Sequence, residues 1–333
     1  MAKLNGKKKA TLYDLFHKNP LAGKGVSKTD TLERNFKNFF KLSWWHMGSI
    51  VSVNLLFLIG NFPVFFGLLG MSGLLTTSMP NPSTITFPNL FGAMSEGGNP
   101  ITATLYGVYG IPSEMAIPNT ATNVMMWLTL LLFLTWGFTN IGTTYIVRNL
   151  VKGDPVFLFH DFFYAIKRNW LQGLIMGILD LLLIVLFVAG GIISYISIMP
   201  YYWYGPLLFY LSGFLAFIYM NMRFYIYSLI ITFDLPLHKV LKNAFILAGV
   251  AMKRNALGFF SIAGLVILEW ALIKYITPLG IILPLIFLYG YCAYIGSYVS
   301  WPKIKELMVD PYEENKKQDA PIEEAPIFSD DVE

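Results

Sequence analysis

The chain has 333 residues and a net charge of +4, with 55% of its residues hydrophobic and only 13% charged. Soluble domains carry about 25% charged residues, so the composition excludes an ordinary soluble protein. The single cysteine, Cys292, excludes an internal disulfide framework and a cysteine-rich metal site. Several stretches longer than about 18 residues carry almost no charge, which is the length of a membrane-spanning helix. We therefore expect an all-α fold, that of a polytopic helical membrane protein.

The N-terminal region, residues 1–42, is basic, with ten Lys and Arg residues and no long apolar run. We expect no cleaved signal peptide here, so the first apolar segment is predicted to be a retained span. Within residues 30–45, the side chains of Phe36, Phe39 and Phe40 recur near helical spacing. This pattern predicts an amphipathic helix on the membrane surface, just before the first span. The region is therefore predicted to be a cytoplasmic arm that ends in an interfacial helix.

Apolar segments predict a transmembrane domain over residues 43–302, with about six helices. Pro63 lies inside the first segment, where we expect a kink. Pro278 separates the last two segments so closely that they must form a hairpin. The acidic tail, 303–333, is expected to be disordered and cytoplasmic. The predicted spans cover residues 44–69, 124–147, 171–198, 206–231, 257–276 and 279–299.

The distribution of Lys and Arg predicts how the spans are oriented. These residues occur in the segments 148–170 and 232–256 and near both ends of the chain. Six spans place every basic segment on one side, and the positive-inside rule makes that side cytoplasmic, with both termini. Lys274, at the outer end of the fifth span, is an exception to this pattern. The exception is mild, because the apolar stem of the side chain lets the ammonium group reach the membrane interface. Lys and Arg are absent from the connections 70–123, 199–205 and 277–278.

The long connection 70–123 is predicted to be extracytoplasmic. Its only charged residues are Glu96 and Glu114, and it is rich in Ser, Thr, Asn, Pro and Gly. Its aromatic residues make it too apolar for a simple disordered linker. Two interpretations stay open: it folds over the outer mouth of the helices or meets an extracellular partner, or it is a passive surface loop.

The tripeptide Lys-Arg-Asn occurs twice, at 167–169 and 253–255, each time close to the start of a predicted span. The stretches 155–170 and 236–252 have apolar residues near helical spacing, which predicts amphipathic helices on the inner membrane surface. With residues 30–45 they give three units, each an interfacial helix followed by a membrane hairpin. We interpret the basic residues near these helix ends as anchors for anionic lipid phosphates rather than as a ligand site. The predicted anchors are Arg148, Lys167, Arg168, Lys253 and Arg254.

The sequence contains none of the common catalytic or nucleotide-binding motifs: no phosphate-binding loop, no zinc-peptidase or serine-hydrolase signature and no Cys-x-x-Cys. The four histidines are scattered, and His160 and Asp161 are adjacent, so on a helix they face different ways. We therefore predict a protein that is not an enzyme, with no catalytic, cofactor-binding or metal-binding residues and no cofactor. Anionic lipid explains the basic arm, so no nucleic acid is expected as a partner.

Charged residues inside the spans are the strongest candidates for function, because a charge in hydrocarbon is costly. Asp180 and Arg223 lie about 12–14 Å from the cytoplasmic ends of the third and fourth spans. Those spans form one hairpin, so we predict that the two side chains pair. The pair is either a structural clasp or a relay or ligand-binding group, and the sequence leaves both open.

Glu269 lies in the fifth span, twelve residues from its predicted start, with no evident partner. Desolvation favours the neutral form of a carboxyl group, and a proton-coupled transporter would need such a residue. Three asparagines add polar candidates, and interhelical hydrogen bonds explain them as well as a substrate path does. They are Asn54, Asn140 and Asn221.

Six stretches of the chain carry a resemblance to a known family. They are GKGVSKTD at 23–30, RNFKNFFKL at 34–42, VNLLFLIGNFPVFF at 53–66, TTYIVRNLVKGDPVFLFHDFFYAIKRNWLQGLIMGIL at 143–179, ITFDLPLHKVLKNAFILA at 231–248 and PIFSDD at 326–331. Together these stretches resemble the YesL family of bacterial membrane proteins. The connection 70–123 departs from the resemblance because it is much longer than the family leads us to expect. The resemblance implies a multi-pass protein of the bacterial cell membrane, from a family widespread in Gram-positive bacteria and often associated with carbohydrate uptake. It implies no catalytic residues.

Two functional classes follow. In the first, the chain is a non-enzymatic accessory protein that binds the permease subunits of an ABC-type carbohydrate importer. In the second, it transports a small solute or lipid itself, using Asp180, Arg223 and Glu269 around a central path. The sequence gives neither the substrate nor the oligomeric state.

Overall fold

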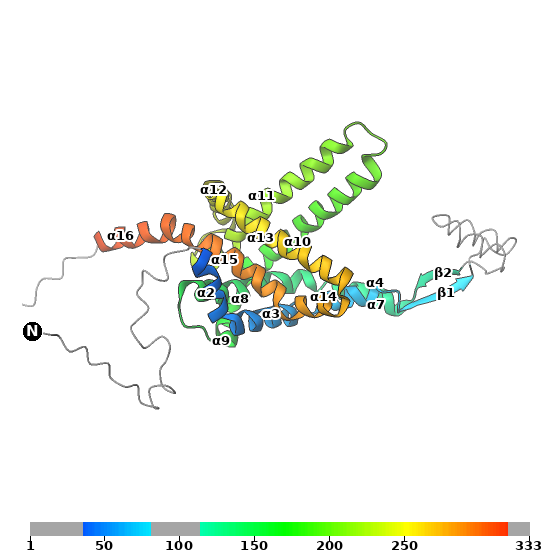
Figure 1. Cartoon of the computed structure of the whole chain (residues 1–333), viewed down its shortest axis with the longest axis horizontal. Coiled ribbons are helices and arrows are strands. Elements are labelled where there is room, and N and C mark those ends of the chain that lie inside the picture. Colours follow the sequence, from blue (N-terminus) through cyan, green and yellow to red (C-terminus); the bar gives the residue numbers. More distant parts are fainter. Residues whose placement is uncertain (1–35, 81–113, 319–333) are drawn as a thin grey trace, which may run out of the picture. The chain divides into compact units, whose positions relative to one another are not determined.

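The computed structural model describes residues 36–80 and 114–318, and these residues are almost entirely helical (Figure 1). Within them, five helices are long and apolar enough to cross a membrane. The number rises to six if the bent pair Lys37–Trp45 and Met47–Gly60, which meet at 71°, is one span. The predicted fold class, an all-α polytopic helical protein, is confirmed.

The helices follow one another in three groups, and a short helix opens each group. The short helices are α2 (Phe36–Trp45), α9 (Leu158–Arg168) and α12 (Leu237–Val250). The first group continues with α3 (Met47–Gly60), α4 (Pro63–Met71), α7 (Thr120–Thr129) and α8 (Leu132–Lys152). The second continues with α10 (Trp170–Ile193), the π-helical turn η2 (Ser194–Ile198) and α11 (Gly205–Thr232). The third continues with α13 (Met252–Tyr275), α14 (Thr277–Leu283), the π-helical turn η3 (Pro284–Leu288), α15 (Tyr289–Ile304), the π-helical turn η4 (Lys305–Val309) and α16 (Asp310–Gln318).

The first predicted span is divided where Pro63 was expected to bend it. Helix α3 ends at Gly60 and α4 begins at Pro63, which occupies the first turn of the new helix. Proline has no N–H to continue the hydrogen-bond ladder, but its fixed φ suits a helix start. The proline therefore ends one helix and begins the next.

Two strands frame the connection that was predicted to be a loop. β1 (Thr76–Pro80) pairs antiparallel with β2 (Glu114–Pro118), and Thr76 lies opposite Pro118. The hydroxyl of Thr122 donates a hydrogen bond of 2.5 Å to the carbonyl of Leu75, beside the ribbon. The two ends of the connection are thus held together. Residues 81–113, on which the interpretations of this connection mainly depend, lie outside the described residues.

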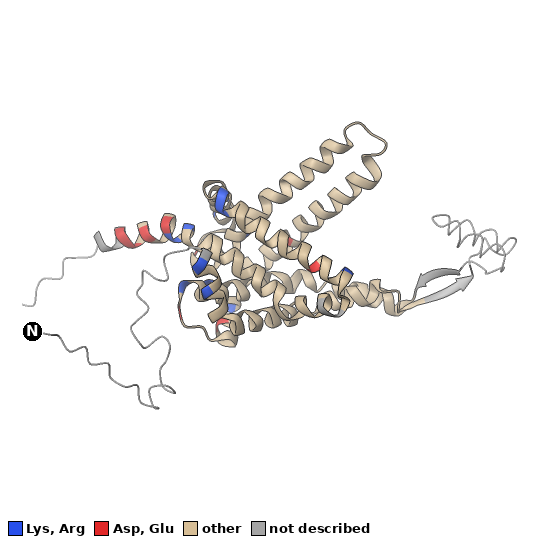
Figure 2. Ribbon diagram, viewed as in Figure 1, with Lys and Arg blue, Asp and Glu red and all other residues tan. Residues whose placement is uncertain are grey.

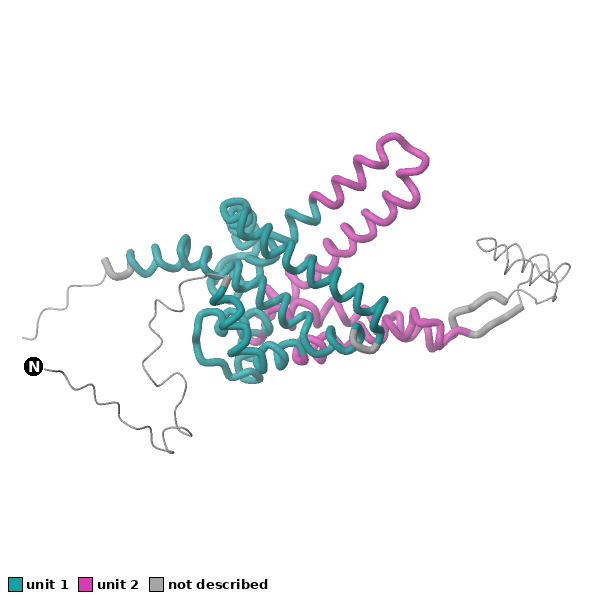
Figure 3. The backbone as a smooth tube through the Cα atoms, in the orientation of Figure 1, with its two compact units in different colours: residues 1–54, 142–165, 215–333 teal, residues 55–141, 166–214 magenta. Residues whose placement is uncertain are grey.

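The chain divides into two compact units (Figure 3). Unit 1 comprises Met1–Asn54, Gly142–Ala165 and Leu215–Glu333, and unit 2 comprises Leu55–Ile141 and Ile166–Phe214. We describe each unit by itself.

Unit 2 contains a close crossing of α8 and α10 that depends on glycine. A Cβ atom added to Gly177 would overlap the Cα atom of Gly137, and one added to Gly137 would overlap the carbonyl of Gly173. Gly173 and Gly177 are four residues apart and therefore share one face of α10. Small residues at this spacing let helix backbones approach closely inside a membrane, where apolar burial does not drive helix association.

In unit 1, the short helices pack on the long ones. The ring of Phe39 in α2 lies 5.1–5.2 Å from the rings of Tyr294 and Tyr298 in α15, and Tyr294 donates a hydrogen bond of 3.0 Å to the Phe39 carbonyl. Phe162 of α9 is buried beside Gly142 of α8. The opposite faces of these helices expose large apolar side chains: Phe40, Trp44 and Trp45 in α2, Phe159 and Phe163 in α9, and Phe245 and Ile246 in α12. Each short helix thus has a protein-facing side and an apolar outer side.

Basic residues of unit 1 gather at one end of its helices (Figure 2). They lie on α2, at the C-terminal ends of α8 and α15, on α12 and in the first turn of α13. Glu269 and Lys274 lie in the other half of α13. This gathering agrees with the charge pattern of the sequence, and the cytoplasmic placement of that end stays a prediction.

The glycine crossing of unit 2 can be tested with Gly177→Ala. The added methyl group overlaps backbone atoms of α8, so we expect the free energy of unfolding to fall by about 1–3 kcal/mol. Gly213→Ala in α11 is the matched control, because its Cβ would meet no atom within 4 Å. Removing that glycine should leave stability unchanged or raise it by about 1 kcal/mol or less. Thermal unfolding in detergent measures both, and equal midpoints would contradict the crossing.

Candidate functional site

The two Lys-Arg-Asn tripeptides do not occupy equivalent positions. In the first, Asn169 precedes α10, so the helix break falls at the asparagine. In the second, α13 has already begun at Met252, and Lys253 to Asn255 lie in its first turn. The sequence repeat is therefore shifted with respect to the helix ends, and the two copies need separate explanations.

Asn255 is a structural group. It is fully buried, donates a hydrogen bond of 3.0 Å to the carbonyl of Ala248 and accepts one of 2.7 Å from the hydroxyl of Tyr225. Ala248 belongs to the last turn of α12, whose final carbonyls have no partner within the helix. Asn255 therefore ties the corner between α12 and α13 to α11.

Three of the five predicted anchors, Lys167, Arg168 and Lys253, are exposed. Arg254 is half-buried, and its Nη2 donates a hydrogen bond of 2.8 Å to the carbonyl of Tyr298 in α15. It thus has a protein partner besides any lipid.

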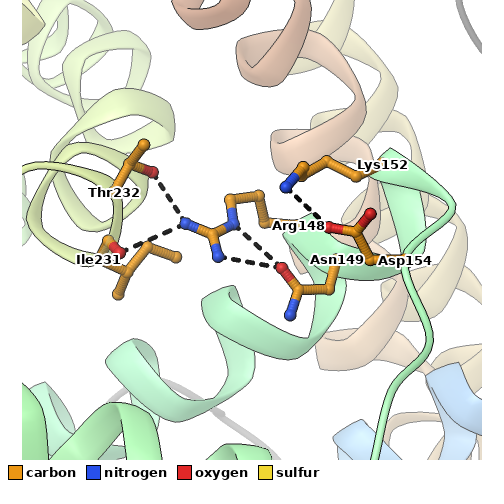
Figure 4. Close-up of polar contacts among 6 residues, drawn as sticks. All are labelled: Arg148, Asn149, Lys152, Asp154, Ile231 and Thr232. Carbon is orange, nitrogen blue, oxygen red and sulfur yellow. Dashed lines mark hydrogen bonds and ion pairs between the residues drawn. The ribbon is translucent and has the colours of Figure 1, made fainter. Parts of the chain in front are cut away.

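Arg148, the fifth predicted anchor, is directed into unit 1 and is only 7% exposed (Figure 4). Its Nη1 donates to the carbonyl of Ile231 at 3.3 Å and to the hydroxyl of Thr232 at 2.9 Å, while Nη2 donates to Asn149 at 2.9 Å. The guanidinium also lies 5.7 Å from the ring centre of Trp301 in α15. Arg148 therefore joins α8 to the C-terminal end of α11 and to α15, and its role as a lipid anchor stays a prediction.

Asn54 is fully buried, and both ends of its amide group are hydrogen-bonded. Its Nδ2 donates hydrogen bonds to the carbonyls of Pro284 and Leu285 at 3.1 and 2.8 Å, and its Oδ1 accepts one of 2.9 Å from the N–H of Gly290. A π-helical turn displaces backbone groups from the regular ladder. Asn54 thus stabilises the irregular backbone between α14 and α15.

Asp180 is fully buried in unit 2, where its Oδ2 accepts a hydrogen bond of 2.8 Å from Nε1 of Trp136. Arg223 belongs to unit 1, where its guanidinium lies 5.7 Å from the ring centre of Tyr227. Since the two residues belong to different units, their pairing stays a prediction. Trp136 precedes Gly137, where α8 and α10 cross, and its hydrogen bond connects α8 to Asp180. The sequence analysis did not single out this residue.

The remaining polar candidates differ from one another. The Nδ2 atoms of Asn140 and Asn221 each donate a hydrogen bond of 2.7 Å to a carbonyl of their own helix, four residues back. Glu269 is buried, with 8% exposure, and its Oε1 has no hydrogen-bond partner among the described residues. Across residues 36–80 and 114–318, no three His, Cys, Asp or Glu side chains are grouped so that they could hold a metal ion.

Comparison of the chain with models of protein families, with curated proteins and with solved structures finds no match.

The role of Asn54 predicts that Asn54→Ala is strongly destabilising. It leaves the carbonyls of Pro284 and Leu285 and the N–H of Gly290 without this partner, and a buried unsatisfied group costs about 1–3 kcal/mol. Ser52→Ala is the control, since the Ser52 hydroxyl bonds to a carbonyl of its own helix. Its effect should stay within about 0.5 kcal/mol. Chemical unfolding in detergent would measure both, and equal effects would show that Asn54 does not support η3.

The Asp180–Arg223 pair can be tested with Asp180→Asn, Arg223→Gln and the double variant. The asparagine keeps an oxygen for Trp136, so the comparison isolates the charge. If the residues pair, each single variant leaves an uncompensated charge and the double variant loses less stability than the two singles added together. Stability losses that simply add, measured by thermal unfolding of the four proteins, would exclude the pair.

Proposed function

We propose that this protein is a non-enzymatic, multi-pass membrane protein that assembles with another membrane complex. The resemblance of its segments to the YesL family makes the permease subunits of an ABC-type carbohydrate importer the proposed partner, in a bacterial cell membrane. Both termini are then cytoplasmic, and the basic ends of the helices face anionic lipid.

The apolar surface of the α10–α11 hairpin is the observation that carries this proposal. In its outer half, large apolar side chains are exposed on both helices, among them Val185, Ile192, Leu207 and Phe214. The two helices touch where the Ser212 hydroxyl donates a hydrogen bond of 3.0 Å to the Phe187 carbonyl. A groove of about 410 Å³ is lined only by apolar surface of Val188, Gly191, Ile192, Tyr195, Ile196 and Phe209.

The tip of the hairpin fixes the depth of this surface. Tyr201, Tyr202 and Trp203 are exposed there, and such side chains prefer the membrane–water interface. The groove begins at Ile196 of η2, about five residues from the tip, so it lies within the hydrocarbon region. A partner that fills it must therefore present apolar groups inside the membrane, as a transmembrane helix does.

The internal polar residues also support a binding role. Asn54, Arg148 and Asn255 bond to backbone or side-chain groups of their own unit and hold helix ends and breaks in place. A substrate path would need polar atoms that are free to exchange partners. Most of the polar candidates here already have fixed structural partners.

A solute or lipid transporter remains the second candidate function because of Glu269. A carboxylate inside an apolar helix, with one oxygen that has no hydrogen-bond partner in the described part of the chain, is the kind of group that a coupled transporter uses.

The assembly is tested by co-purification of the tagged protein from its native membranes, after cross-linking and in mild detergent. Gly191→Leu would fill the groove, and we expect it to lower the recovery of importer permease subunits by about tenfold, equivalent to 1.4 kcal/mol of binding. Gly213→Leu, in the same hairpin but with no neighbour within 4 Å of its Cβ, should leave recovery unchanged. Recovery of the protein alone from unmodified membranes would contradict the proposed assembly. Solute flux measurements with a Glu269→Gln variant would then test the transporter.

A further inference from the structure

Two neighbouring segments of unit 2 are interrupted close to the same level. The first segment passes from α3 to α4 and is interrupted between Gly60 and Pro63. The second passes from α7 to α8 and is interrupted between Thr129 and Leu132. Both interruptions belong to unit 2, so the contacts within that unit show how the two segments are aligned.

Three contacts fix the alignment of the two segments. They join Asn61 to Thr135 by a hydrogen bond, and Gly67 to Thr129 and Gly70 to Met126 by close packing of the glycine. Each step forward along the first segment is matched by an equal step back along the second, as in antiparallel neighbours. On this alignment, residues 62–65 of the first segment lie opposite residues 131–134 of the second.

Both segments have the tighter 3₁₀ pattern of hydrogen bonds over these residues. The N–H groups that donate to the carbonyl three residues earlier are those of Phe62, Val64 and Phe65 in the first segment and of Leu131, Phe133 and Leu134 in the second. In a regular α-helix, each N–H donates four residues back. A single 3₁₀ turn is common at a helix end, whereas a 3₁₀ stretch in the middle of a helical segment is typical of a hinge. Two such stretches opposite each other allow both segments to bend at one level.

On one side of the interruptions, α4 and α7 are joined to each other along their length. Gly67 and Gly70 bring α4 into close contact with α7. The hydrogen bond from the Thr122 hydroxyl to the Leu75 carbonyl continues this contact, and the ribbon of β1 and β2 follows it. Helices α4 and α7 and the ribbon therefore form one packed body, which we call the arm.

On the other side, the end of α3 is packed on α8 and, through α8, on α10. A Cβ atom added to Gly60 would overlap the methyl group of Thr139, and the ring of Phe57 lies 5.6 Å from that of Trp136. Trp136 is also hydrogen-bonded to Asp180 of α10. The last turns of α3 and the first parts of α8 and α10 therefore form a second packed body, which we call the base.

The polar pair next to the interruptions is loosely bonded. Asn61 is only 3% exposed, and its Oδ1 lies 3.4 Å from the Thr135 hydroxyl. This distance is longer than the range of about 2.5–3.0 Å that is usual for such hydrogen bonds. The Nδ2 atom of Asn61 has no hydrogen-bond partner among the described residues. The amide group therefore has unused bonding capacity for backbone groups that a bend would release.

We propose that the arm tilts as one body on the base, about a double hinge formed by residues 60–63 and 129–132. The arm carries the connection between β1 and β2 at its far end, so its tilt sets the position of that connection relative to the crossing of α8 and α10. A tilt of about 20°, the size of a sharp helix kink, would move the far end of the nine-residue helix α4 by about 5 Å. This inference does not depend on the partner proposed for the α10–α11 hairpin.

The tilt is measured by electron–electron double resonance between two spin labels on the full-length protein in lipid nanodiscs. Cys292→Ser first removes the single cysteine, and one label is placed in the base at Ile175→Cys. The second label is placed in the base at Ile59→Cys, or in the arm at Met71→Cys or Trp127→Cys. All four labelled side chains are exposed in the structure.

The pair within the base should give one narrow distance distribution. Both pairs that join arm and base should give distributions that are broadened or split by about 5 Å, because a tilt moves the arm alone. Arm pairs that are as narrow as the base pair would overturn the proposal. The protein without substitutions in the hinge is sufficient for this comparison.

The hinge itself is tested by the double variant Asn61→Leu and Pro63→Ala. Leucine and alanine favour a continuous helix, and alanine restores the N–H that proline lacks. The variant should narrow both arm pairs, including the one with its label at Trp127 on the other segment, because the arm is one body. Gly213→Ala, whose Cβ would meet no atom within 4 Å, is the control and should leave all widths unchanged. A double variant that leaves the Trp127 pair broad would show that the arm does not tilt as one body about this hinge.

Discussion

In the hydrocarbon core of a membrane, a polar group that loses its partner cannot turn to water. A regular helix satisfies its own backbone, so the demand for polar side chains is greatest where helices break or end. Three buried residues of unit 1 occupy such places: Asn54 at η3, Arg148 at the end of α11 and Asn255 at the corner between α12 and α13. These side chains make the irregular backbone possible, and the rest of unit 1 packs around them.

Close packing between helices is a second requirement of the fold, and the two halves of α10 differ in how they meet it. Near its start, Gly173 and Gly177 allow contact with α8 at backbone distance, and Asp180 bonds to Trp136 one turn later. Beyond this point α10 exposes large apolar side chains, and a Cβ atom added to Gly190 or Gly191 would touch Ser212 at an ordinary contact distance of 3.7 Å. The inner half is thus used for packing within the chain, whereas the outer half has apolar surface available to lipid or to a partner.

Much of the fold could be predicted because long apolar runs and helical spacing are local properties. The helix break at Pro63 and the helices at α2, α9 and α12 follow from such patterns. The roles of Arg148 and Asn255 could not be predicted in this way. Both stand in basic segments that suggest lipid contact, yet their partners lie up to 84 residues away. The π-helical turn at η3 was also missed, because it depends on Asn54, a residue 230 positions from Pro284.

The contrast between Asn54 and Glu269 bears most directly on function. The amide of Asn54 supplies donors and an acceptor to the backbone at η3 and carries no charge, whereas Oε1 of the buried Glu269 has no hydrogen-bond partner among the described residues. A glutamine at position 269 would fill nearly the same volume as the glutamate and would carry no charge. An acid at this position therefore adds a cost that helix packing alone does not require. For this reason Glu269, rather than the well-bonded Asn54, is the buried polar residue whose presence the packing of unit 1 does not explain.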